Sequence, residues 1–184
     1  MQANEFDVIV IGSGFGGSVM TCRLAERGYR VCLLERGREY GMYQFPRRMD
    51  EVRNQVFWDP QDGKFGLLEL RDYPESDVIS VSASGLGGGS LIYANVLMPM
   101  PAEFFQGWPG GITREVLDPY YAKVLEMLEA SPYPHASDPY YADTPKTTLF
   151  QKAAATIQPA PDALEPPTFC YPHLAVRFQG DFPG

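Results

Sequence analysis

The feature that most constrains the fold is a glycine-rich segment near the N-terminus, Gly12-Ser13-Gly14-Phe15-Gly16-Gly17. It fits the spacing G-x-G-x-x-G and directly follows the apolar run from Phe6 to Ile11, which is polar only at Asp7. A short apolar run without alternation is typical of a strand that is buried on both faces of a parallel sheet. The sequence therefore predicts a buried strand, a tight glycine turn and the start of a helix.

The residues after the glycine turn complete a familiar pattern. Apolar residues recur at roughly helical spacing between Val19 and Ala25, and Gly28 is a stop signal at the helix C-terminus. Residues 31–35 then predict a second strand. Strand, helix and strand form a βαβ unit of about thirty residues, with parallel strands and a right-handed crossover.

Each glycine of the turn has its own expected task in binding a dinucleotide. Gly12 allows the tight turn, Gly14 lets a pyrophosphate approach the backbone, and Gly17 lets the helix pack closely on the strands. The free N–H groups at the helix N-terminus favour the phosphates. Glu35 ends the second strand, where its carboxylate can accept hydrogen bonds from the adenosine ribose and disfavours a 2′-phosphate.

Composition excludes several classes of protein. With 184 residues the chain is long enough for one domain, or for one domain and part of another. Its 45% hydrophobic and 13% aromatic residues exclude a wholly disordered chain, and its net charge of −8 argues against a nucleic-acid binder. The start lacks the basic segment of a secretory signal and no apolar run could span a membrane, which predicts a cytoplasmic protein. The three cysteines have no metal-ligand spacing, so no metal site is expected.

The remaining elements are expected as follows. Residues 36–75 mix glycine, proline, arginine and aromatic residues, which predicts a long excursion without a regular element. A strand is expected over 77–82, and a helix can start in the glycine-rich residues that follow it. Residues 113–130 predict one helix, or two with a break at Asp118-Pro119. A helix over 144–157, an extended connector over 159–167 and a strand over 174–178 complete the chain.

A second glycine cluster, Gly85-Leu86-Gly87-Gly88-Gly89-Ser90, follows the expected strand at 77–82. The first glycine motif alone leaves NAD and FAD as alternatives, because both cofactors use it. A second nest of backbone N–H groups suits a longer, extended cofactor, since its pyrophosphate and its ring need separate contacts. This cluster favours FAD, although a flexible loop would have the same composition.

Three segments together resemble a known family: Asp7 to Ser18, Leu33-Leu34-Glu35-Arg36-Gly37, and Gly85 to Asn95. They are similar to the glucose-methanol-choline (GMC) flavin oxidoreductases, and within that family to the cholesterol-oxidase branch. The resemblance continues through Trp108-Pro109 and Leu117 to Tyr121, and so covers the chain to about residue 135. It implies an α/β, Rossmann-like FAD-binding core followed by a loop-rich segment that belongs partly to a substrate domain. Residues 1–130 would be the FAD-binding portion and 131–184 the Pro-rich start of a truncated substrate domain.

By position, the resemblance implies that the first glycine motif binds the FAD pyrophosphate, Glu35 the ribose, and the second cluster the pyrophosphate and flavin. Asn95 would face the flavin ring, although the family's Asn comes sooner, where Tyr93 stands here. The candidate cofactor-binding residues are Gly12, Ser13, Gly14, Phe15, Gly16, Gly17, Glu35, Arg36, Gly85, Gly87, Gly88, Gly89, Ser90 and Asn95.

The resemblance also implies an activity, the oxidation of a small-molecule alcohol or a sterol by hydride transfer to FAD. In the longer members of the family the catalytic histidine lies near the C-terminus. Neither His135 nor His173 matches it, so the catalytic residue is unknown. This predicts the cofactor-binding N-terminal portion of such an enzyme, with a separate C-terminal chain as a candidate partner. A non-catalytic, partner-dependent fragment and an NAD-dependent dehydrogenase are the alternatives.

Overall fold

The computed structural model describes residues 5–41, 43–46, 48, 56–135, 137–158 and 169–178. The chain divides into two compact units, Met1–Ala94 and Asn95–Gly184. The domain boundary expected at residue 130 stays a prediction. The connector expected over 159–167 lies outside the described residues.

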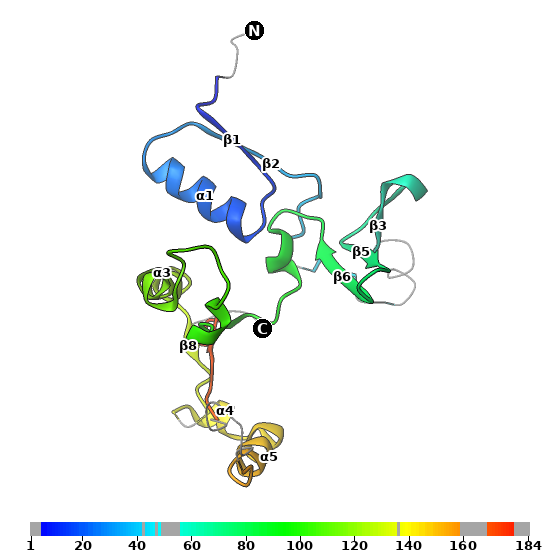
Figure 1. The fold of residues 1–184 in the computed structure, drawn as a ribbon. Helices are drawn as coiled ribbons and strands as arrows, with labels where there is room; N and C mark the ends of the chain where they lie inside the picture. Colours follow the sequence, from blue (N-terminus) through cyan, green and yellow to red (C-terminus); the bar gives the residue numbers. More distant parts are fainter. Residues whose placement is uncertain are drawn as a thin grey trace. The chain divides into compact units, whose positions relative to one another are not determined.

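The first unit begins with the predicted βαβ arrangement. Strand β1 (Val8–Ile11) pairs in parallel with β2 (Val31–Leu34), so that Ile11 lies opposite Leu34. Helix α1 (Phe15–Glu26) connects the two strands and lies alongside them (Figure 1). Just after the helix, Gly28 has a φ of 85° and its N–H donates to the carbonyl of Ala25 at 2.9 Å. The predicted strands, helix and glycine stop are confirmed.

The two faces of this parallel pair differ. Val8 and Val10 are half-buried on the side where α1 packs, while Ile9 and Ile11 are 62% and 85% exposed. Burial of the first strand on both faces was therefore a wrong expectation for the described residues. The apolar run does predict a parallel strand, but α1 covers only one of its faces.

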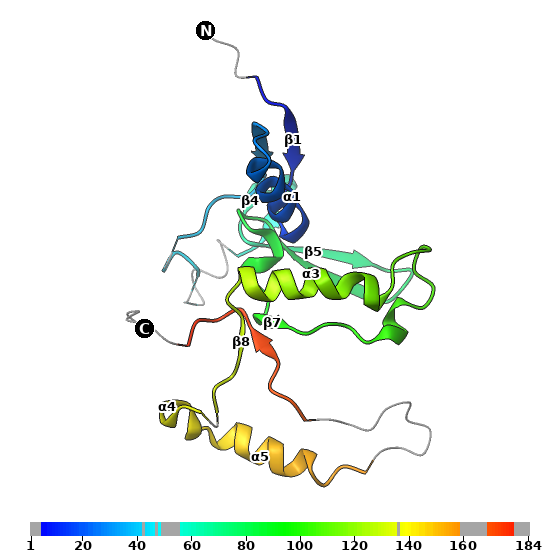
Figure 2. The ribbon, with the colours of Figure 1, turned by 90° about the vertical axis from the view of Figure 1, so that its left-hand side faces the viewer.

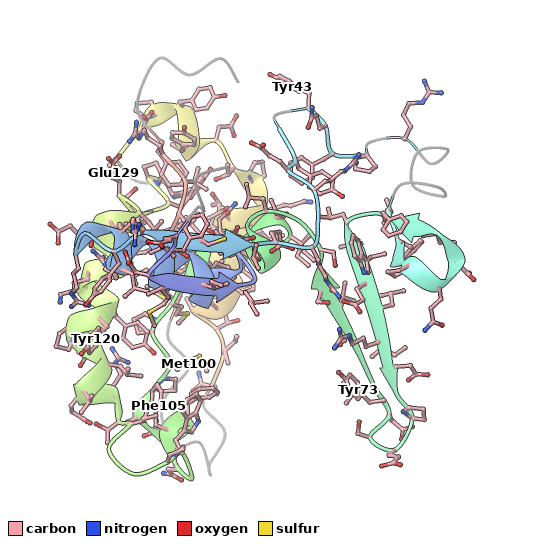
Figure 3. The ribbon with its side chains drawn as sticks, turned by 90° about the horizontal axis from the view of Figure 1, so that it is seen from above. Tyr43, Tyr73, Met100, Phe105, Tyr120 and Glu129 are labelled. Atoms are coloured by element: carbon pink, nitrogen blue, oxygen red, sulfur yellow. The ribbon has the colours of Figure 1, made fainter. Side chains whose placement is uncertain are left out.

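The excursion expected over residues 36–75 was also wrong in part, because strands form within it. β3 (Trp58–Asp59) and β4 (Lys64–Phe65) pair across the 3-10 helix η1 (Pro60–Asp62). β5 (Leu68–Tyr73) forms an antiparallel hairpin with β6 (Val78–Ala83), and Tyr73 lies near its turn (Figure 3). β6 matches the strand expected over 77–82. The helix proposed for the second glycine cluster is a single 3-10 turn, η2 (Gly88–Leu91).

The second unit contains a small antiparallel sheet and three α-helices among its described residues (Figure 2). Strand β9 (His173–Leu174) lies between β7 (Val96–Leu97) and β8 (Ser131–Pro132). The strand expected over 174–178 is confirmed only at Leu174 and was wrong over 175–178, because pairing with β7 and β8 is limited to His173 and Leu174. The helices are α3 (Arg114–Met127), α4 (Pro139–Ala142) and α5 (Pro145–Ala154), after the 3-10 helix η3 (Ala102–Phe105).

Helix α3 settles the alternative left open for residues 113–130. It is one helix that runs through Pro119, and its cap is Thr113, whose hydroxyl accepts from the Val116 N–H at 3.4 Å. The helix predicted over 144–157 is confirmed as α5, which ends three residues earlier, at Ala154. No described helix is long and apolar enough to cross a membrane.

Candidate nucleotide-binding site

The first glycine turn joins the end of β1 to the start of α1. Gly12 has a φ of 90°, which L residues rarely adopt, and its N–H donates to the Leu34 carbonyl at 2.7 Å. A Cβ at Gly17 would overlap the carbonyl oxygen of Gly12. Gly17 therefore provides the close packing of helix on strand that was expected of it.

The N-terminus of α1 is open at this turn. Gly14 is the residue that caps the helix, and no side chain caps the helix in its place. A Cβ at Gly14 or at Gly16 would meet no atom within 4 Å. The space beside these two glycines is therefore open, and the partial positive charge of the helix N-terminus would favour a phosphate there.

The second glycine cluster packs directly against the first. A Cβ at Gly88 would lie 2.8 Å from the Cα of Gly14, and one at Gly89 would lie 3.2 Å from the Phe15 ring. Figures 1 and 2 both show the turn of η2 beside the N-terminal end of α1. Gly87 and Gly88 have φ values of 111° and 54°, so this backbone also favours glycine. The fold thus brings together Gly14 and Gly88, which are more than seventy residues apart in the sequence.

Ser13 connects three segments at this junction. Its side chain is 1% exposed, and its hydroxyl donates to a carboxylate oxygen (Oε2) of Glu35 at 2.6 Å. The same hydroxyl accepts from the Gly87 N–H at 2.9 Å. The backbone N–H of Ser13 donates to the same Glu35 oxygen at 2.9 Å, and Ser18 donates to the Ser13 carbonyl at 2.5 Å.

Glu35 is held from both sides. Its second oxygen (Oε1) accepts from the Gly37 N–H at 2.9 Å. Partial burial alone would raise the pKa of Glu35, but the hydrogen bonds from Ser13 and Gly37 outweigh it and lower the pKa below its ordinary value. Glu35 is therefore ionised at neutral pH. Ser13 and Gly37 donate three hydrogen bonds to this carboxylate, and the backbone N–H of Arg36 also contributes to lowering its pKa.

Gly37 belongs to this site, although the sequence reasoning did not select it. A Cβ at Gly37 would overlap the backbone of Ser84 and Gly85. On the other side of Gly85, a Cβ would lie 2.9 Å from the ring of Tyr40. The signal in the sequence was the glycine two positions after the acidic residue, but the close approach depends on a segment far along the chain.

The other candidate residues lie as follows. Gly85 packs against Gly37, and the Ser90 hydroxyl donates to the Gly87 carbonyl at 2.9 Å. The Arg36 guanidinium donates to Glu69 and, at 2.8 Å, to Ser84, so it is bound to the β5–β6 hairpin. Asn95, with a φ of 60°, lies in the second unit and accepts from the Ala175 N–H at 2.8 Å.

Both histidines lie in the second unit. The His135 ring stacks on Tyr171 with 5.6 Å between the centroids, and its Nε2 lies 3.3 Å from the Thr148 hydroxyl. His173 lies in β9. Within the part of the chain that the structure describes, no cluster of metal-ligating side chains occurs.

Comparison with known proteins gives one matching domain family and several relatives. A family model described as an NAD(P)-binding Rossmann-like domain matches residues 10–62. A cholesterol oxidase of Mycobacterium tuberculosis is 40% identical over 138 residues, which are 73% of this chain and 23% of that protein. A cholesterol oxidase of Acinetobacter baumannii is 35% identical over 67% of this chain and 22% of its own. A 2-methyl-1,2-propanediol dehydrogenase of Mycolicibacterium austroafricanum is 33% identical over 65% of this chain and 24% of its own.

These matches support the fold class. The N-terminal βαβ unit is a Rossmann-like nucleotide-binding fold, as predicted. The chain spans about a quarter of the length of these relatives.

Proposed function

We propose that this chain, which is similar to oxidoreductases of the GMC type, forms the FAD-binding part of an enzyme that oxidises an alcohol. The observation that carries the proposal is the packing of Gly88 against Gly14. A dinucleotide enzyme that needs only the first glycine turn has no use for a second one built onto it. Two adjoining glycine backbones suit an extended cofactor with a pyrophosphate and a ring beyond it.

Residues of the chain supply binding and orientation. The N-terminus of α1 would hold the pyrophosphate, and the ionised Glu35 carboxylate would accept a hydrogen bond from a ribose hydroxyl. Gly87, Gly88, Gly89 and Ser90 would lie along the pyrophosphate and the flavin. FAD, when bound, supplies the acceptor for a hydride from the carbinol carbon of the substrate. No general base is assigned to this chain.

The substrate class follows from the relatives. Their names specify cholesterol and a small diol, which share an alcohol group. We therefore assign an alcohol as the substrate, with a sterol as the finer proposal. A cytoplasmic location and a separate C-terminal chain stay predictions.

The first test is a visible absorption spectrum of the desalted chain before and after FAD is added, since oxidised flavin absorbs visible light. Gly14→Ala is the informative variant, because its Cβ would meet open space in the chain but would occupy the approach of the pyrophosphate. We expect FAD binding to weaken about tenfold or more, which corresponds to about 1.4 kcal/mol. Gly110→Ala is the matched control, because a Cβ there also meets nothing within 4 Å. Equal FAD binding by both variants would contradict the proposed site.

The charge of Glu35 gives a second test, on nucleotide preference. The Glu35 carboxylate would repel a 2′-phosphate, and Arg36, the neighbouring cation, is bound to Glu69 and Ser84. We expect AMP to compete with FAD about tenfold more strongly than adenosine 2′,5′-bisphosphate does, and Glu35→Gln to reduce this difference. Competition titrations followed by flavin fluorescence would measure both. Equal competition by the two nucleotides in the unaltered chain would place the ribose elsewhere.

A partner-dependent nucleotide-binding segment is the second candidate. The exposure of Ile9 and Ile11 favours it, because an uncovered sheet face is typical of a surface that another element covers. A chain that binds no FAD and exposes apolar surface would support this candidate. A chain that retains flavin absorption after desalting would support the FAD-binding part instead.

A further inference from the structure

The buried hydroxyl of Ser13 differs from the other groups of the glycine turn, because it contacts both of the other segments at the site. It lies between the Glu35 carboxylate and the Gly87 N–H, which are 22 and 74 residues away in the sequence. Ser13 is only 1% exposed, so a ligand would not reach this side chain. Its role must therefore be exerted through its neighbours.

The hydrogen-bonding pattern of Ser13 is well defined. A serine hydroxyl has one proton and two lone pairs. The proton has two acceptors in range, Glu35 Oε2 at 2.6 Å and the Gly85 carbonyl at 3.5 Å. The shorter bond to the charged oxygen is the stronger, so the proton points to Glu35 and a lone pair accepts from Gly87. The Ser13 hydroxyl thus connects the Glu35 carboxylate to the Gly87 N–H through two hydrogen bonds.

Apart from this bond, Gly89 packs on the Phe15 ring of the first turn, and the Leu86 N–H donates to the Arg38 carbonyl at 3.0 Å. Gly88 contacts Gly14 by backbone packing, and the Ser90 hydroxyl donates within its own cluster, to Gly87. Gly87 and Gly88 are glycines with positive φ, so their backbone is intrinsically free to adopt other conformations. Without the bond to Ser13, packing alone would hold Gly87 and Gly88 at the first turn, and these two residues would spend part of their time away from the helix N-terminus.

We propose that Ser13 is a positioning residue, whose hydroxyl holds the second glycine cluster against the first before any cofactor arrives. The inference rests on the proposed FAD-binding function. In the absence of this bond, only a fraction of the free chain would have the two clusters in place, and the apparent affinity for FAD would fall to that fraction of its intrinsic value. Hydrogen bonds to charged groups have net values that correspond to about a tenfold to hundredfold change in an equilibrium.

The test combines FAD binding with amide hydrogen exchange in the Ser13→Ala variant. We expect FAD to bind about tenfold to a hundredfold more weakly. In the free chain the Gly87 amide should exchange faster, while the amides of β1 and β2 exchange as before. With saturating FAD the difference at Gly87 should become smaller, because the bound cofactor holds the cluster.

Ser84→Ala is the matched control. Ser84 is also 1% exposed, but its hydroxyl accepts from Arg36 and does not join the two clusters. We expect this variant to leave the exchange of the Gly87 amide unchanged. If Ser13→Ala does not fold, Ser13→Cys keeps a weak donor of similar size and should show an intermediate effect.

The outcomes separate this inference from the proposed function. Unchanged FAD affinity and unchanged Gly87 exchange in the Ser13 variant would overturn the positioning role and leave the FAD site in place. If the unaltered chain binds no FAD, the proposed function fails. The exchange of Gly87 in the free chain would then still decide whether Ser13 holds the second cluster.

Discussion

At the scale of single residues, the neighbouring glycines Gly16 and Gly17 differ in the room that the fold leaves for a side chain. A Cβ at Gly17 would overlap the Gly12 carbonyl, whereas one at Gly16 would meet nothing within 4 Å. We expect Gly17→Ala to lower the free energy of unfolding by about 3 kcal/mol, because α1 would have to move away from β1. Urea unfolding followed by circular dichroism would measure it.

Gly16→Ala is the internal control for this effect. Alanine in the first turn of a helix is favoured over glycine by about 0.5–1 kcal/mol. The control should therefore be as stable as the unaltered chain or slightly more stable. Equal unfolding midpoints for the two variants would show that the close packing of helix on strand is not needed.

The residues of the site also show how far a sequence can be interpreted. The task of Gly17 could be predicted, because the turn, the helix and the strand are neighbours in the sequence. The packing of Gly37 on Gly85 and the bonds of Ser13 could not, because they join segments far apart in the chain. Whether the candidate residues bind a cofactor stays a prediction.

At the scale of elements, local patterns explain both successes and errors. The βαβ unit is marked by turn and stop signals and was predicted correctly. Strand β5 was missed, although Leu68 and Leu70 alternate with polar neighbours, because the alternation breaks at Asp72 and nearby glycine and proline residues obscured it. Its partner β6 was predicted, so a pairing search for the hairpin would have found the missing strand.

An ion pair between Asp7 and Arg30 joins the residues just before β1 and β2, and it predicts that the stability of the fold depends on pH. The side-chain hydrogen bonds from Arg30 hold the pKa of Asp7 at about 2, below its ordinary value of 3.8. Because the folded pKa is depressed, the stabilising contribution is present above about pH 4 and is lost as the pH falls towards 2.

The measurement for this ion pair compares the unaltered chain with Asp7→Asn. Urea midpoints at about pH 5 should differ between the two, and the difference should shrink as the pH falls to about 2. Asp7 is exposed, so we expect the difference to be small. A difference that stays constant across this range would show that the charge of Asp7 is not what joins the strands.

At the scale of the whole molecule, the uncovered face of the β1–β2 pair predicts how the chain behaves in solution. Ile11 lies opposite Leu34 in the register, and the two side chains are 85% and 50% exposed. A two-stranded sheet also has two open edges, which favour pairing with other chains. We expect the isolated chain to bind a fluorescent apolar dye and to self-associate as its concentration rises.

Ile11→Thr and Val10→Thr make this prediction specific to one face of the same strand. Ile11→Thr should reduce dye binding and self-association with little change in unfolding, because the side chain is almost fully exposed. Val10 is half-buried on the side of α1, so Val10→Thr should lower the free energy of unfolding by about 1–2 kcal/mol and leave the exposed face intact. Dye fluorescence and light scattering would separate the two variants. If both variants reduced dye binding equally, the dye would be reporting general loosening of the fold rather than the exposed face of β1.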